Sequence, residues 1–159
     1  MLFRQITHDD LGCASYLIGD DDAGVAAVVD PKFEIDEYLE LARYVGVSIE
    51  HILETHNHAD HVSGHGRLAA ATGATIHVHR DAAPDYDHEP FDDGWELSLG
   101  AVKVRAVHVP GHRPEHTAFV SRLAAAQAQP RAPGGLNHGA GSGCNRLLSS
   151  RPRRVRTAG

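Results

Sequence analysis

The residues best suited to chemistry form one short, histidine-rich cluster. His56 and His58 are two positions apart, and Asp60 and His61 follow them closely. Because alternate residues of an extended segment point the same way, His56 and His58 can converge on one metal ion. Asp60 and His61 come at the expected start of a helix, from which they can face a second ion. Imidazole and carboxylate ligands suit zinc, iron or manganese, so the spacing predicts a metal site.

A second histidine motif can complete the ligand set of the first ion. His112 follows the Pro110-Gly111 turn at the end of an apolar strand. With His56 and His58 it offers three imidazoles, a set that leaves one coordination position for water. His116 lies close to His112, which favours a supporting role. We expect core, surface or loop roles for the histidines without such spacing, namely His8, His51, His65, His77, His79, His88, His108 and His138.

The elements that must position these motifs follow a mixed α/β order. Short apolar or alternating runs predict strands over residues 14–18, 26–29, 49–53, 75–79, 95–99, 102–107 and 117–120. Helical periodicity predicts helices over residues 35–45 and 62–72, with glycine after each. Residues 80–94 are polar and contain Pro and Gly, which predicts a long loop. Each histidine motif therefore follows a strand, and we expect an α/β fold.

The charge of the chain changes along its length. Residues 1–115 hold all 21 acidic residues, whereas residues 116–159 hold no acid and 7 arginines. From residue 122 onward Gly, Pro, Ala, Ser and Arg dominate without periodicity, which predicts a folded domain over residues 1–121 and an unstructured tail over residues 122–159. A nucleic-acid-binding tail is the alternative, but a run of charge alone rarely specifies a partner.

Composition excludes several classes of protein. The formal net charge of −6 gives no general case for binding nucleic acid. No apolar run approaches the roughly 20 residues of a membrane helix. The opening residues lack the basic and apolar segments of a secretory signal. The two cysteines, Cys13 and Cys144, are too few for a disulfide framework. We therefore expect a cytoplasmic protein that does not enter a membrane.

Together, these motifs resemble the metallo-β-lactamase superfamily. The resemblance rests on Thr55–His61, Val28–Pro31 and Pro110–His112, and it covers about residues 2–121. It is strongest to the branch of hydroxyacylglutathione hydrolases (glyoxalase II) and persulfide dioxygenases, and Pro110–Thr117 is similar to the bacterial dioxygenases. The family fold is an αβ/βα sandwich with metals at one edge. The resemblance implies that this chain forms the first half of that sandwich.

The resemblance also implies roles for individual residues. His56, His58 and His112 would hold the first metal ion. Asp60 and His61 would belong to a second site, with Asp60 as the candidate catalytic residue. Two further residues would support the ligands, namely Asp30 and His116.

The implied cofactor and substrate differ between the two family branches. The hydrolases use two zinc-type ions and a bridging hydroxide to attack a thioester. The dioxygenases use one iron, held by the residues that match His56 and His112 and by a later aspartate. The implied substrate is accordingly a glutathione thioester or a persulfide.

The sequence departs from the family after Glu115. No acidic residue follows it, so the family's later aspartate has no counterpart, and His138 lies in a segment that resembles no family element. We expect a C-terminally truncated or frameshifted family member; a natural short variant is the alternative. Two functions therefore compete, namely a metalloenzyme and an inactive fragment that binds at most one ion. We expect one ion per chain, zinc rather than iron.

Overall fold

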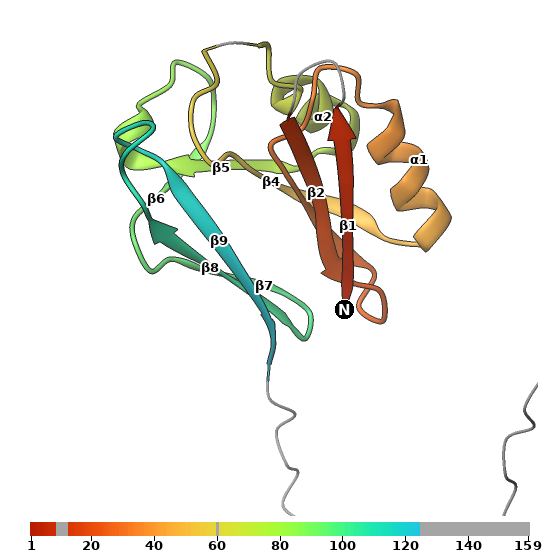
Figure 1. The fold of residues 1–159 in the computed structure, drawn as a ribbon. Coiled ribbons are helices and arrows are strands. Elements are labelled where there is room, and N and C mark those ends of the chain that lie inside the picture. Colours follow the sequence, from red (N-terminus) through yellow and green to blue (C-terminus); the bar gives the residue numbers. More distant parts are fainter. Residues whose placement is uncertain (9–12, 60, 125–159) are drawn as a thin grey trace, which may run out of the picture. The chain divides into compact units, whose positions relative to one another are not determined.

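The computed structural model describes residues 1–8, 13–59 and 61–124, which form two β-sheets with helices beside them (Figure 1). The larger sheet has six strands in sequential order: β1 (Leu2–His8), β2 (Cys13–Asp20), β3 (Val25–Val29), β4 (Ser48–Leu53), β5 (Thr75–His79) and β6 (Glu89–Phe91). The smaller sheet contains β7 (Glu96–Leu99), β8 (Val102–His108) and β9 (Thr117–Leu123). The helical segments are α1 (Asp36–Val45), α2 (His65–Thr72) and the 3-10 turn η1 (Arg80–Ala82).

Strand direction in the larger sheet changes at β3. β1, β2 and β3 are antiparallel neighbours, whereas β3, β4, β5 and β6 run parallel to one another. Parallel neighbours need a crossover connection, which α1 supplies between β3 and β4 and α2 between β4 and β5. The carboxyl ends of β3 and β4 consequently meet at one edge of the sheet.

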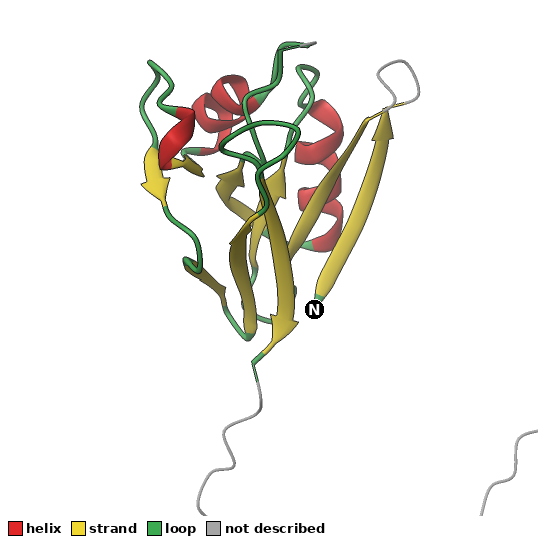
Figure 2. Ribbon diagram, turned by 60° about the vertical axis from the view of Figure 1, so that its left-hand side comes forward, coloured by secondary structure: helices red, strands yellow, loops and turns green. Residues whose placement is uncertain are grey.

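Two apolar clusters hold the layers together. One joins the larger sheet to the helices through residues such as Val28, Tyr38 and Leu68. The other lies between the two sheets and includes Leu53 and Val104. The helices and the smaller sheet therefore cover opposite faces of the larger sheet (Figure 2).

Local sequence explains where α1 begins and ends. Asp36 and Glu37 lie in its first turn, where negative charge is favourable beside the helix N-terminus. Gly46 follows the helix with a φ of 78°, and its N–H bonds the carbonyl oxygen of Ala42. The left-handed conformation suits glycine, so the expected stop at Gly46 is confirmed.

The structure differs from the expected elements at four places. β1 was not expected, and the expected loop over residues 80–94 contains η1 and β6. β6 forms because Glu89–Phe91 pairs in parallel with β5. Pro90 and the polar residues around this segment give no sequence signal for a strand. The helix expected from residue 62 begins only at His65, because Ser63 pairs with Lys32 before it. β9 continues beyond the expected residue 120 to Leu123, opposite Val102.

Several predictions fall outside the residues that the structure describes. These are the roles of Asp60 and His138 and nearly all of the expected tail, from residue 125 onward. Within the ranges that are described, no helix is long and apolar enough to cross a membrane.

Candidate metal centre

The candidate metal centre is built from the segments that leave β3 and β4 and from the loop between β8 and β9. Asp30 directly follows β3, and its N–H bonds the carbonyl oxygen of Leu53 at the end of β4 at 3.0 Å. Thr117, at the start of β9, donates its N–H to the carbonyl oxygen of Thr55 at 2.9 Å. The two sheets therefore bring both histidine motifs to the same edge.

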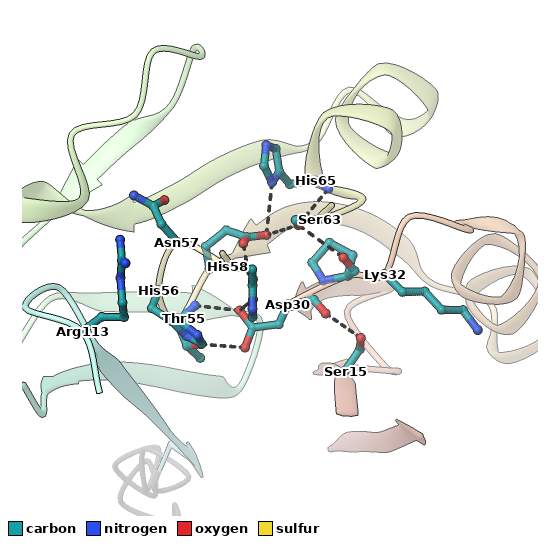
Figure 3. A network of polar contacts seen from close by, with 12 residues as sticks. Ser15, Asp30, Lys32, Thr55, His56, Asn57, His58, Ser63, His65 and Arg113 are labelled. Atoms are coloured by element: carbon teal, nitrogen blue, oxygen red, sulfur yellow. Dashed lines mark hydrogen bonds and ion pairs between the residues drawn. The ribbon is translucent and has the colours of Figure 1, made fainter. Parts of the chain in front are cut away.

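Asp30 fixes the entry to the first motif. Its φ of 48° is left-handed, a conformation uncommon for a residue other than glycine. Its carboxylate accepts the backbone N–H of Thr55 at 2.7 Å and the Thr55 hydroxyl at 2.8 Å (Figure 3). Behind it, Ser15 donates its hydroxyl to the Asp30 carbonyl oxygen. Asp30 therefore links the end of β3 to Thr55 and to Ser15 of β2.

The same contacts select one tautomer of His56. The Thr55 hydroxyl has a single proton, which it gives to the Asp30 carboxylate. His56 Nδ1 lies 2.8 Å from that hydroxyl oxygen and must therefore be the donor in this contact. In the neutral ring the lone pair then belongs to Nε2. A histidine whose second nitrogen is anchored in this way is typical of metal ligands.

His58 lies against two carboxylates. Its Nε2 is 3.5 Å from Asp30 Oδ1 and 3.9 Å from Glu54 Oε2, which favours a proton on Nε2. Glu54 is buried, and burial raises the pKa of its carboxyl group. Its other oxygen accepts a hydrogen bond from Ser63 at 2.9 Å and lies 3.5 Å from His65 Nδ1. We did not expect Glu54, Ser63 or His65 at the site.

The imidazole rings of the two motifs gather around His56. Its ring centroid lies 4.3 Å from that of His58 and 5.0 Å from those of His112 and His116. Burial, with a smaller contribution from His58, lowers the pKa of His56 and keeps its ring neutral at neutral pH. The ring centroid of His61 lies 4.3 Å from that of His58. His61 lies in the loop before α2, rather than at the start of that helix as expected.

The nitrogens of this cluster are more widely spaced than metal ligands. In the part of the chain that the structure describes, two sets of side chains place one ligand atom each within 4.8 Å of one another. They are Asp30, Glu54 and His58, and His79, Asp81 and His108. His56, His58 and His112 form neither set, so one ion can bind all three only after their side chains rotate.

Glu115 joins the second motif to the first. It is 2% exposed, and Oε1 accepts hydrogen bonds from the N–H of Asn57 and from Arg113 Nε, both at 3.1 Å. Burial acts to raise the pKa of Glu115, but the hydrogen bonds from backbone N–H groups and from Arg113 outweigh it and lower the pKa. The charged Glu115 carboxylate therefore links the loop that carries His56 and His58 to the loop that carries His112 and His116. We did not predict this role from the sequence.

Two cavities adjoin the candidate metal centre. One of about 340 Å³ opens beside His58 and His61 and is also lined by Tyr86. The other, of about 290 Å³, is lined mostly by apolar side chains, among them Phe3 and Phe119, and reaches Asp30 and Thr55. The first cavity therefore borders histidines of the candidate metal centre, whereas the second borders the residues that orient His56.

Comparisons with known proteins identify related sequences. Residues 8–146 match the family model described as the metallo-beta-lactamase superfamily. A hydroxyacylglutathione hydrolase of Methylococcus capsulatus is 38% identical over 109 residues, which cover 65% of this chain and 41% of that protein. One from Anaeromyxobacter dehalogenans is 44% identical over 95 residues, or 57% of this chain and 36% of that protein. The chain thus spans less than half the length of these relatives.

Solved structures share the fold. A metallo-beta-lactamase from Staphylococcus aureus superposes with a TM-score of 0.72 at 32% identity, covering 77% of this chain and 38% of that one. ETHE1 from Myxococcus xanthus superposes with a TM-score of 0.71 at 28% identity, covering 76% of this chain and 54% of that one. The expected sandwich fold is confirmed for the matched part of the chain.

Proposed function

This chain belongs to the metallo-β-lactamase superfamily, and on that premise we propose that it binds one transition-metal ion and acts on a small glutathione conjugate. The ligands are His56, His58 and His112, and zinc is preferred to iron because three imidazoles form a sufficient zinc set. The similarity to hydroxyacylglutathione hydrolases supports a thioester or a persulfide as the substrate. We also propose the division of the chain near residue 121 and a cytoplasmic location.

The tautomer of His56 is the observation that carries this proposal. The contacts through Thr55 to Asp30 leave the lone pair on Nε2, and the rings of His58 and His112 lie 4.3 and 5.0 Å away. Neutral imidazoles with an anchored second nitrogen fit a zinc-type ion chemically. Side-chain rotation would bring the remaining nitrogens within coordination distance.

The residues of the chain divide the proposed work between them. A bound ion would act as a Lewis acid that lowers the pKa of water and polarises the substrate. Asp30 and Thr55 orient His56, and Glu115 holds the loop that carries His112 and His116. Asp60 and His61 remain candidates for a second ion or, for Asp60, for proton transfer.

A second candidate function is binding of one ion without turnover. It is favoured by the sequence, since no acidic residue follows Glu115 to replace the family's later aspartate. In that case the chain retains only the first metal site.

Ion counting and turnover together separate these functions. We expect zinc at the site around His56 in the purified chain, about one ion per chain fewer in the His112→Ala variant, and an unchanged count in the His138→Ala control. Hydrolysis of S-lactoylglutathione or oxidation of glutathione persulfide by the zinc- or iron-loaded chain would identify an enzyme. A metal-loaded chain without either activity would support the second function. An equal zinc count in the His112→Ala variant and the unsubstituted chain would contradict the proposed ligand set.

A further inference from the structure

A second group of metal-capable side chains includes none of the histidines of the candidate metal centre. His79 ends β5, Asp81 lies in η1, and His108 ends β8. One ligand atom from each lies within 4.8 Å of the others. His79 is buried, whereas the Asp81 side chain is 59% exposed, so the group is reachable from solvent. From the sequence we expected no metal-binding role for His79 or His108, because the two histidines lie 29 positions apart.

His108 is held as a metal ligand would be. Its Nε2 lies 2.6 Å from the carbonyl oxygen of Pro114, which can only accept, so Nε2 carries a proton. The lone pair of the neutral ring therefore belongs to Nδ1. Metal-binding histidines commonly donate their other ring N–H to a backbone carbonyl in this way. The backbone N–H of His108 is also fixed, by Asp93 at 2.9 Å.

His79 also carries a lone pair on Nδ1, which at present accepts a backbone N–H. Its Nδ1 accepts the backbone N–H of Asp81 at 3.3 Å, so this nitrogen carries no proton. The same Nδ1 lies 3.7 Å from Asp81 Oδ2. The rings of His79 and His108 stack at 4.3 Å with an interplanar angle of 17°, and the edge of Phe91 contacts His79. Two imidazole rings and one carboxylate are therefore neighbours.

Neighbouring charges do not oppose a cation here. Arg80, between His79 and Asp81, carries a positive charge. Its Nε and one terminal guanidinium nitrogen donate hydrogen bonds to the Asp92 carboxylate, at 3.0 and 2.9 Å. That pairing compensates the Arg80 charge. Asp93 contributes a further negative charge beside His108.

We propose that His79, Asp81 and His108 form a binding site for a second divalent transition-metal ion of the zinc class. Two imidazoles and a carboxylate, with water in the remaining position, suit zinc and disfavour calcium or magnesium. Ligand atoms of a tetrahedral zinc site lie roughly 3.3 Å apart. Binding would therefore require the two stacked rings to turn toward the ion, and His79 Nδ1 would exchange the Asp81 N–H for it. An ion there would also brace the loop of His112, because His108 bonds Pro114 within that loop.

The test uses the full chain in a His56→Ala/His112→Ala background, which removes the ligand set proposed for the first site. Zinc is titrated while the nitrogen chemical shifts of the histidine rings are followed by NMR. We expect Nδ1 of His79 and of His108 to shift on saturation. Asp81→Ala, a change at an exposed position, should weaken zinc binding by at least about tenfold. Asp87→Ala, at an exposed position in the following loop, is the matched control and should leave it unchanged.

Two outcomes would overturn this proposal. One is that excess zinc leaves both Nδ1 resonances unmoved. The other is that Asp81→Ala and Asp87→Ala bind zinc equally well. Neither outcome bears on the site around His56, which the background variant lacks. Conversely, if the unsubstituted chain failed to bind zinc at the site around His56, the zinc-induced shifts of His79 and His108 would still be expected.

Discussion

Replacing Glu115 with alanine should loosen the tie between the two histidine loops. The substitution removes the acceptor of the Asn57 N–H and of Arg113 Nε. A buried donor left without a partner costs about 1–3 kcal/mol. The Arg113 side chain is 40% exposed and can hydrogen-bond water instead, so loss of its ion pair with Glu115 adds little to the cost in stability. We expect the free energy of unfolding to fall by about 2 kcal/mol.

Glutamine at the same position separates hydrogen bonding from charge. Glu115→Gln keeps an oxygen that can accept the Asn57 N–H and loses only the charge facing Arg113. Its cost should therefore stay below about 1 kcal/mol. Urea unfolding, followed by the fluorescence of the single tryptophan, Trp95, measures both variants. Glu40→Ala, at an exposed position of α1, is the control.

The zinc affinity of these variants tests whether Glu115 positions the site or only stabilises the fold. Under conditions where the chain remains folded, Glu115→Ala should bind zinc more weakly than Glu115→Gln, because the loop of His112 is less constrained. Equal stability of Glu115→Ala and Glu40→Ala would refute the reasoning. Equal damage from Glu115→Ala and Glu115→Gln would show that charge, rather than the acceptor oxygen, matters.

Three further predictions concern stability. Burial lowers the pKa of His77 to about 4 in the folded chain, below its ordinary value of 6.5. The folded chain therefore loses stability as the pH falls from 6.5 toward 4, because the unfolded chain binds the proton more readily. His77→Phe should reduce this pH dependence of the thermal unfolding temperature. Gly64→Ala should cost about 3 kcal/mol, because a Cβ would overlap the carbonyl oxygen of Lys32, whereas Gly66→Ala, with open space around it, should gain up to about 1 kcal/mol in urea unfolding. Tyr38→Phe should cost about 1–2 kcal/mol, since the buried hydroxyl accepts the Lys32 N–H at 2.8 Å; an unchanged urea midpoint would contradict this.

Features that depend on local sequence could be predicted. The apolar runs located β2, β3, β4 and β5, and Gly46 marked the end of α1. The spacing of His56 and His58 predicted neighbouring side chains, and their rings lie 4.3 Å apart. In each case the signal lies within one element or within a few residues of its end, where local backbone geometry decides which side chains are neighbours.

Features that depend on distant contacts could not be predicted. Glu115 reaches the N–H of Asn57 across 58 positions of sequence, and no pattern near either residue announces that contact. Glu54 and His65 likewise come together only through folding. β6 has the composition of a loop and becomes a strand by pairing with β5. Sequence patterns therefore found the histidines of the candidate centre, whereas the groups that orient them required the structure.

Anomalous diffraction at the zinc absorption edge, from crystals of the full chain grown with zinc, tests the central claim most directly. The account predicts a strong peak among His56, His58 and His112, about 2.0–2.1 Å from one nitrogen of each ring. It further predicts that the coordinating atom of His56 is Nε2, with Nδ1 still bonded to Thr55. The absence of a peak at that position, or coordination of His56 through Nδ1, would contradict it.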